Sequence, residues 1–242
     1  MRQKYKNYTL EDQEVWNILT SKQLNNLPGK AHPEYLACLA ELENVLHVEA
    51  IPRFGELNEV LSAKHGWSIS VVPGLIPVED FFKKLKKRKF SASTWLRSKD
   101  QLNSLEEHDM FHDVFGHIPL LMNESYANFV QKLGVLGVKY IDNKKIVTQL
   151  QRLYWFTIEF GLIKEKNSTL IYGAGIISSS GETDHVINDD VEVKEYDIFD
   201  IIEQDFITSE IQTKYYALDD FDQLYRSIEN LEKSLMEQSE VD

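Results

Sequence analysis

Two histidines are the residues of this chain whose type and spacing best suit metal chemistry. His112 and His117 lie five residues apart in the segment 107–119, which reads EHDMFHDVFGHIP. On a straight α-helix this spacing points two side chains well away from each other. Gly116 and Pro119 predict that the helix ends near His117, so the second imidazole can turn towards the first.

Two other residues of this segment are candidates for supporting roles. Asp109 lies three residues before His112, on the same face of a helix. Its carboxylate could accept the free ring N–H of His112 and hold the tautomer, as outer partners of metal ligands do. His108 is interpreted as a solvated histidine or another outer partner. Without a third ligand, two ordinary histidines, one in the core and one near a helix end, would explain the same spacing.

Glu159 is the third candidate ligand, because it lies in an apolar stretch. Its helical neighbours are all apolar: Trp155, Phe156, Leu162 and Ile163. Burying a carboxylate there costs several kcal/mol unless positive charge meets it. Arg152, nearly two turns away, is one candidate partner. A divalent cation that two imidazoles also bind is the better one.

Two imidazoles and one carboxylate with open positions form the facial triad of non-haem iron(II) oxygenases. The open positions let O2 and a substrate approach the metal. The same ligand types also hold catalytic zinc, so a zinc-dependent hydrolase is the alternative. The His-Glu-x-x-His motif of zinc proteases is absent from the sequence.

Helical patterns dominate the elements that must position these residues. Helices are predicted over 9–27, 33–46, 56–64, 77–89, 123–133, 142–161 and 219–238. Strands are predicted at 68–72 and at the start of 170–181, which continues as a Gly/Ser-rich turn. We therefore predict a mainly α fold with small β elements, in a single domain spanning 1–242. The amphipathic helix at 219–238 either covers this domain or contacts a partner. This helix is the one feature that favours a third hypothesis, a non-catalytic helical module.

Composition narrows the class of protein. Hydrophobic residues make up 43% and charged residues 27% of the chain, as in a soluble globular domain. The formal net charge of -13 argues against nucleic acid or an anionic membrane as a partner. We expect neither a signal peptide nor a membrane span, because residues 1–7 are polar and long apolar runs are absent. One cysteine, Cys38, cannot form an internal disulfide, so we expect the reducing cytoplasm.

Three motifs follow one another in a specific order. They are residues 112–119 (HDVFGHIP), 154–161 (YWFTIEFG) and 172–182 (YGAGIISSSGE). With them, the chain resembles the catalytic domain of the pterin-dependent aromatic amino acid hydroxylases over about 8–221. The resemblance is closest to the bacterial members that act on phenylalanine, and it implies the single-domain catalytic fold of the family.

The resemblance also implies an activity. The chain would be a monooxygenase that uses iron(II), tetrahydrobiopterin or a related tetrahydropterin, and O2 to hydroxylate L-phenylalanine to L-tyrosine. Hydroxylation of tryptophan at position 5 or of phenylalanine at position 3 are alternatives, because pocket shape cannot be read from sequence. A free amino acid would be the partner, and we expect a minimal, monomeric catalytic unit.

Site residues follow from the same resemblance. His112, His117 and Glu159 would be the iron ligands, and Arg97, fifteen residues before His112, would bind the substrate carboxylate. The other substrate residues would be Trp155 and Phe160, which wall the aromatic ring, with Ser178 and Ser179. The pterin would lie against Gly74 and Ile76, stack on Phe81 and approach Asp113. Tyr154 and Glu182 would line the iron-facing side, where Glu182 could order water or pterin.

The chain departs from the family pattern before the first ligand. Where the family commonly has Thr-Pro-Glu-Pro-Asp, residues 105–109 read LEEHD. Leu105 replaces a threonine whose hydroxyl helps to hold the amino acid, and His108 replaces a proline. Asp113 stands where a glutamate near the pterin is usual. These changes leave the three proposed ligands intact.

Overall fold

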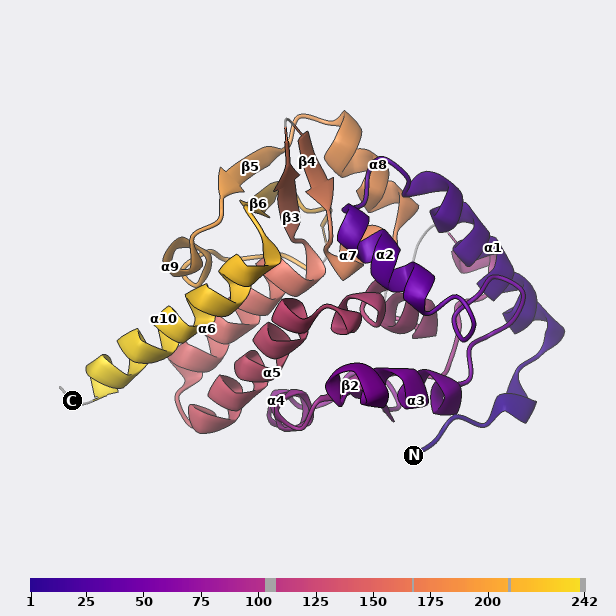
Figure 1. The fold of residues 1–242 in the computed structure, drawn as a ribbon, viewed down its shortest axis with the longest axis horizontal. Helices are drawn as coiled ribbons and strands as arrows, with labels where there is room; N and C mark the ends of the chain where they lie inside the picture. Colours follow the sequence, from indigo (N-terminus) through magenta and orange to yellow (C-terminus); the bar gives the residue numbers. More distant parts are fainter. Residues whose placement is uncertain (103–107, 167, 209, 240–242) are drawn as a thin grey trace.

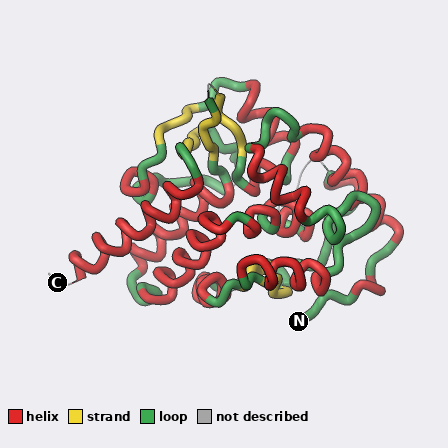
Figure 2. Tube along the Cα trace, viewed as in Figure 1, coloured by secondary structure: helices red, strands yellow, loops and turns green. Residues whose placement is uncertain are grey.

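The structure is a computed structural model that describes residues 1–102, 108–166, 168–208 and 210–239. Helices form most of it, and the strands are short (Figures 1 and 2). The helices are α1 (Leu10–Asn26), α2 (Pro33–Glu41), α3 (Phe54–His65), α4 (Val78–Lys86), α5 (Glu124–Lys139), α6 (Lys144–Tyr154), α7 (Ala174–Ile177), α8 (Ser180–Asn188), α9 (Ile198–Ile201) and α10 (Phe221–Ser239). The prediction of a mainly α fold with small β elements is confirmed.

The predicted helices begin within two residues of the positions that the sequence indicates. The Thr9 hydroxyl accepts a hydrogen bond from the Asp12 N–H at 3.1 Å, and the Asp12 carboxylate accepts one from the Thr9 N–H at 2.7 Å. This reciprocal pair starts α1. Gly66 ends α3 with φ of 72°, a left-handed conformation that glycine adopts without strain. The prediction for 33–46 is wrong at its end, because α2 stops at Glu41 and the chain continues in tight turns.

Two small sheets complete the fold. One pairs β1 (Ser68–Val71) in parallel with β2 (Lys89–Ala92), and α4 connects them. The other has the order β4-β3-β6-β5, built from β3 (Leu162–Glu165), β4 (Ser168–Ile171), β5 (Glu192–Glu195) and β6 (Lys214–Leu218). In it β3 and β4 are antiparallel neighbours, whereas β6 runs parallel to both β3 and β5. Residues 170–181 continue from β4 into α7 and α8, where we had predicted a turn.

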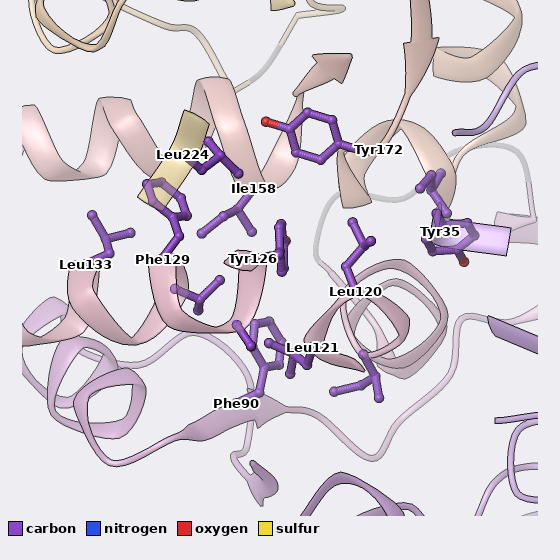
Figure 3. Close-up of a cluster of buried hydrophobic side chains, with 14 of the residues drawn as sticks. Tyr35, Phe90, Leu120, Leu121, Tyr126, Phe129, Leu133, Ile158, Tyr172 and Leu224 are labelled. Atoms are coloured by element: carbon purple, nitrogen blue, oxygen red, sulfur yellow. The ribbon is translucent and has the colours of Figure 1, made fainter. Parts of the chain in front are cut away.

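Helix α5 lies at the centre of one buried hydrophobic cluster. Helix α10 runs beside it (Figure 1), and the ring of Tyr126 on α5 lies 6.1 Å from that of Phe221 on α10. Figure 3 shows part of this cluster around Tyr126. Helix α4 packs on α5 at two glycines, Gly134 and Gly137. A Cβ at Gly134 would lie 2.3 Å from the backbone N of Lys86, and one at Gly137 would meet the ring of Phe82. The C-terminal helix therefore covers the core.

Among the described helices, none combines the length and the apolar character that crossing a membrane requires.

Candidate metal and substrate site

Both segments that carry the predicted ligands adopt π-helical turns, at His112–Gly116 and Trp155–Glu159. In such a turn a backbone N–H bonds the carbonyl five residues earlier, as Phe160 N–H does with Trp155 O at 2.9 Å. Residues five apart then face nearly the same way, so His112 and His117 converge. The first helix ends at Gly116, which confirms the prediction that it ends near His117, but its π-helical form was not predicted. The helix predicted to run to Gly161 is α6 up to Tyr154 and continues as a π-helical turn to Glu159.

Three side chains meet between these turns. The Nε2 atoms of His112 and His117 lie 3.1 Å apart. The Glu159 carboxylate lies 3.3 Å from Nε2 of His117 and 3.6 Å from Nε2 of His112. Ligands bound to one cation through bonds of about 2.1 Å lie roughly 3.0–3.4 Å apart. The three side chains therefore fit a divalent cation.

The surroundings of Glu159 support the same conclusion. The residue is 4% exposed, and its Oε2 atom lacks a hydrogen-bond partner among the described residues, as does Nδ1 of His117. Arg152, the alternative partner that we considered, bonds instead to Asp205 and to the carbonyl of Ile202. A buried carboxylate with no cationic side chain on it is costly, and a metal ion removes that cost.

Ser178 holds the tautomer of His112. Its hydroxyl donates to the carbonyl of Ala174 at 2.8 Å, so it must accept from Nδ1–H of His112, also at 2.8 Å. Nε2 of His112 is then unprotonated and points towards Glu159. We had expected Asp109 to perform this task. Asp109 instead accepts the backbone N–H of His112 at 3.1 Å, because its carboxylate lies beside the backbone of the turn.

The ionisation of the group suits a cation. Burial raises the pKa of Glu159, but the imidazoles of His117 and His112 oppose this effect and bring the pKa well below its usual value. Burial and the nearby His108 lower the pKa of His112 well below its usual value. A charged carboxylate and a neutral imidazole are the forms that bind metal ions.

Asp113, predicted to approach the pterin, has a shifted ionisation too. Burial raises the pKa of Asp113 to about 6, although the Ser93 N–H donates to its carboxylate at 2.7 Å.

A further imidazole lies at the same centre. The ring of His108 stacks on that of His112, with centroids 3.7 Å apart and planes tilted by 31°. Ligand atoms of His108, His112 and Glu159 all lie within 4.8 Å of one another. His117 lies closer to the other two side chains and is buried, whereas His108 is exposed. His117 is therefore a better third candidate ligand beside His112 and Glu159 than His108 is.

Two cavities meet at this centre. The larger cavity has a volume of about 480 Å³. It is lined by the three candidate ligands, by Tyr154 and by every residue predicted for the pterin, which are Gly74, Ile76, Phe81 and Asp113. The smaller cavity has a volume of about 220 Å³. It is lined by Glu182 and by every residue predicted for the substrate, which are Arg97, Trp155, Phe160, Ser178 and Ser179. His108, His112 and Trp155 line both cavities. Two organic molecules could therefore approach one metal from different sides.

Arg97 is buried at the wall of the smaller cavity. Its Nε and Nη2 atoms donate to the Asp109 carboxylate at 2.8 and 2.9 Å. This two-point ion pair holds the guanidinium plane in one orientation. Asp109 thus positions Arg97 as well as the turn that carries His112.

Aromatic rings wall both cavities. In the larger, the ring of Phe81 meets that of Tyr154 edge-on at 5.2 Å. In the smaller, Trp155 lies 4.6 Å from Phe160. Trp155 also stacks on Phe206 at 4.6 Å, a contact that the sequence reasoning missed. Phe206 lies outside the helices and strands, where no periodic pattern marks it.

Glu182 and Tyr154 lie in protected positions. Burial raises the pKa of Glu182, and its Oε2 atom has no hydrogen-bond partner among the described residues. Burial and the nearby Glu159 raise the pKa of Tyr154 well above its usual value, so its phenol keeps its proton. The predicted role of Leu105 lies outside the described residues.

Known proteins share both the sequence and the fold. The sequence profile of the biopterin-dependent aromatic amino acid hydroxylases matches residues 4–242. A phenylalanine-4-hydroxylase of Ralstonia nicotianae is 40% identical over 226 residues, 93% of this chain and 71% of that protein. The phenylalanine-4-hydroxylase of Pseudomonas aeruginosa is 36% identical over 219 residues, 90% of this chain and 82% of that protein.

Solved structures agree with this result. Phenylalanine hydroxylase of Chromobacterium violaceum with bound iron(III) and 7,8-dihydrobiopterin superposes with a TM-score of 0.91 and 38% identity, over 98% of this chain and 86% of that one. The same enzyme bound to cobalt gives a TM-score of 0.91 over 94% of this chain and 82% of that one. Sequence, fold and converging ligands together show that this chain belongs to the biopterin-dependent aromatic amino acid hydroxylases.

Proposed function

We propose that this chain converts L-phenylalanine to L-tyrosine with iron(II), a tetrahydropterin and O2, and that His112, His117 and Glu159 bind the iron. The observation that carries the proposal is the convergence of these three side chains, 3.1–3.6 Å apart, where two cavities meet. The membership of the family and the names of its bacterial relatives support phenylalanine as the substrate.

The bound iron and pterin supply the activation of O2 and the two electrons that a ring hydroxylation needs. The chain supplies binding and orientation. Arg97, oriented by Asp109, binds the amino acid carboxylate, while Trp155 and Phe160 hold the aromatic ring. The aromatic side chains that line both cavities limit the water that reaches the reacting centre once both molecules are bound.

The larger cavity is the proposed pterin site. Gly74, with φ of 157°, turns the chain at its rim and has no atom within 4 Å of a built Cβ. The pterin ring would lie against Ile76 and stack on Phe81, whose ring is half-buried. Asp113 and Tyr154 complete this wall, and Glu182 faces the centre from the other cavity.

Other products of the same chemistry are the alternatives. Phenylalanine 3-hydroxylation would need a different ring carbon at the metal, and tryptophan 5-hydroxylation would also need room for the larger indole ring. A more distant relative, 31% identical over 92% of this chain, is a tyrosine 3-monooxygenase of Schistosoma mansoni. Aerobic incubation with iron(II), tetrahydrobiopterin and each aromatic amino acid, with products separated by ring position, distinguishes them. We expect tyrosine from phenylalanine as the main product.

The ligand assignment has its own test. Glu159→Gln keeps the size of the side chain and removes its charge, so we expect loss of both iron binding and hydroxylation. Glu165→Gln, at the half-buried end of β3 where the carboxylate pairs with His32, is the matched control and is expected to retain both. A Glu159→Gln protein that bound iron and turned over normally would contradict the assignment. Turnover of esters or peptides with zinc alone would instead favour the hydrolase.

We also propose that residues 1–242 act as one catalytic domain, as a monomer, in the cytoplasm. One buried cluster extends from α1 to α10, and α10 covers α5 within the same chain. The single, buried Cys38 suits a reducing compartment. Sedimentation at the mass of one 28.1 kDa chain would support the monomer.

A further inference from the structure

His108 occupies a position that the proposed function does not use. Its side chain is exposed, yet its ring stacks on the candidate ligand His112. It lines both cavities, so it stands between the proposed pterin and amino acid sites.

The distances place this imidazole at the edge of the metal site. Ligand atoms of His108, His112 and Glu159 lie within 4.8 Å of one another. Ligand atoms already bound to one cation lie roughly 3.0–3.4 Å apart, so this limit leaves His108 within reach of the metal position. The side chain of His108 is exposed, so a rotation about its own side-chain bonds can bring a ring nitrogen closer to the metal position.

We propose that His108 is a fourth, displaceable ligand of the metal, added to His112, His117 and Glu159. This inference rests on the proposed function, since it needs those three to bind the ion. The three are held by burial, by the two π-helical turns and by Ser178. His108 has none of these restraints among the described residues, so it is the ligand that can leave.

A displaceable imidazole has a consequence for both cavities. Before the organic molecules arrive, His108 occupies one of the positions that a facial triad leaves open. Because His108 lines both cavities, turning its ring onto the metal moves the ring into the space where the cavities meet, and molecules bound in both cavities compete for that space. Binding of phenylalanine and the pterin therefore releases His108 and opens that position.

Stacking alone is the competing explanation for the position of His108. A ring that only stacks on His112 would leave the affinity for metal unchanged when its nitrogen atoms are lost. His108→Phe separates the two explanations, since phenylalanine keeps a stacking ring without a donor atom. His108→Gln removes the ring as well. His47→Phe, at an exposed histidine that pairs with Glu49, is the matched control.

The test uses the full chain loaded with Co(II), whose bound imidazoles give hyperfine-shifted proton signals in NMR spectra. We expect signals from three imidazoles in the wild type and in His47→Phe, and from two in His108→Phe and His108→Gln. The affinity for Co(II), measured by competition with a chelator, should fall at least the roughly tenfold that loss of an outer partner causes. Adding phenylalanine and 7,8-dihydrobiopterin should remove the third set of signals from the wild type.

Two outcomes would overturn the inference in different ways. Equal affinity and two sets of signals in the wild type and both His108 variants would leave the three-ligand site intact and exclude His108. Failure of the wild-type chain to bind Co(II), or normal binding by Glu159→Gln, would refute the proposed function and the inference with it.

Discussion

At the scale of single residues, the proposed metal site depends on contacts outside its three ligands. The Ser178 hydroxyl directs the proton of His112 to Nδ1 and leaves Nε2 free for a metal. Asp109 joins Arg97 to the turn that carries His112, so the proposed substrate and metal contacts share one buried carboxylate. Removing such an outer partner should change affinity without removing a ligand.

Ser178→Ala tests this dependence. Without the hydroxyl, Nδ1–H of His112 loses its acceptor, and the tautomer with a free Nε2 is no longer favoured. We expect the affinity for Fe(II) or Co(II) to fall by about 10- to 100-fold, the usual effect of losing an outer partner. Competition with a chromophoric chelator measures it.

Ser180→Ala is the matched control, because Ser180 lines the same cavity but lies two residues further along the chain. We expect its metal affinity to equal that of the wild type. If Ser178→Ala bound metal as tightly as Ser180→Ala, the hydroxyl would not control the tautomer.

The sequence allowed the three proposed ligands to be predicted, but not this outer contact. A carboxylate among apolar neighbours marks Glu159, and two nearby imidazoles mark His112 and His117. Ser178 and His112 are 66 residues apart, and nothing in their local patterns indicates which atom of which ring they share. Helical spacing therefore predicted that the Asp109 carboxylate accepts from the His112 ring, whereas it accepts the backbone N–H of His112.

At the scale of elements, the short helix α7 holds the two ligand segments together. Gly173, directly before it, lies so close that a Cβ there would meet the carbonyl O of Glu159 at 2.4 Å. Gly116, at the end of the other π-helical turn, would place a Cβ 2.9 Å from the carbonyl O of Ala174. Close backbone packing around α7 thus sets the distance between the histidines and Glu159.

Gly173→Ala should disturb this packing. The added methyl group collides with backbone atoms, which cannot rotate away, so we expect a loss of about 1–3 kcal/mol in the free energy of unfolding. We also expect weaker binding of Co(II), because Glu159 must shift. Urea unfolding and chelator competition measure the two effects.

Gly55→Ala provides the comparison. Gly55 lies in the first turn of α3 with no atom within 4 Å of a built Cβ, and alanine favours a helix by up to about 1 kcal/mol. Its stability should stay level or rise. Equal behaviour of the two variants would show that close approach at Gly173 is unimportant.

Prediction of the elements depended on how local their signals are. Thr9, Pro33 and Gly66 mark helix ends through their own backbone preferences, and these helices were predicted. The strands β2, β3, β5 and β6 were missed, because each is four or five residues long and its local pattern does not show which segment it pairs with. The π-helical turns were missed for a related reason, since they pack against α7 and local propensity does not favour them.

At the scale of the whole molecule, the C-terminal helix α10 packs on α5. The sequence left open whether its apolar face covers the domain or meets a partner. In the structure four regularly spaced residues of that face are buried: Leu224, Ile228, Leu231 and Leu235. The face packs on α5, which supplies none of the proposed ligands.

Ile228→Ala should therefore reduce stability without changing the metal site. Ile228 is fully buried, and replacing such a residue by alanine costs about 2–5 kcal/mol. We expect this loss in urea unfolding, with unchanged affinity for Co(II) under conditions where the protein is folded. Met236→Ala, on the same helix but 46% exposed, should change stability by less than about 0.5 kcal/mol. Equal, small effects of both substitutions would mean that α10 does not stay on α5 in solution, and its apolar face would then be free for a partner.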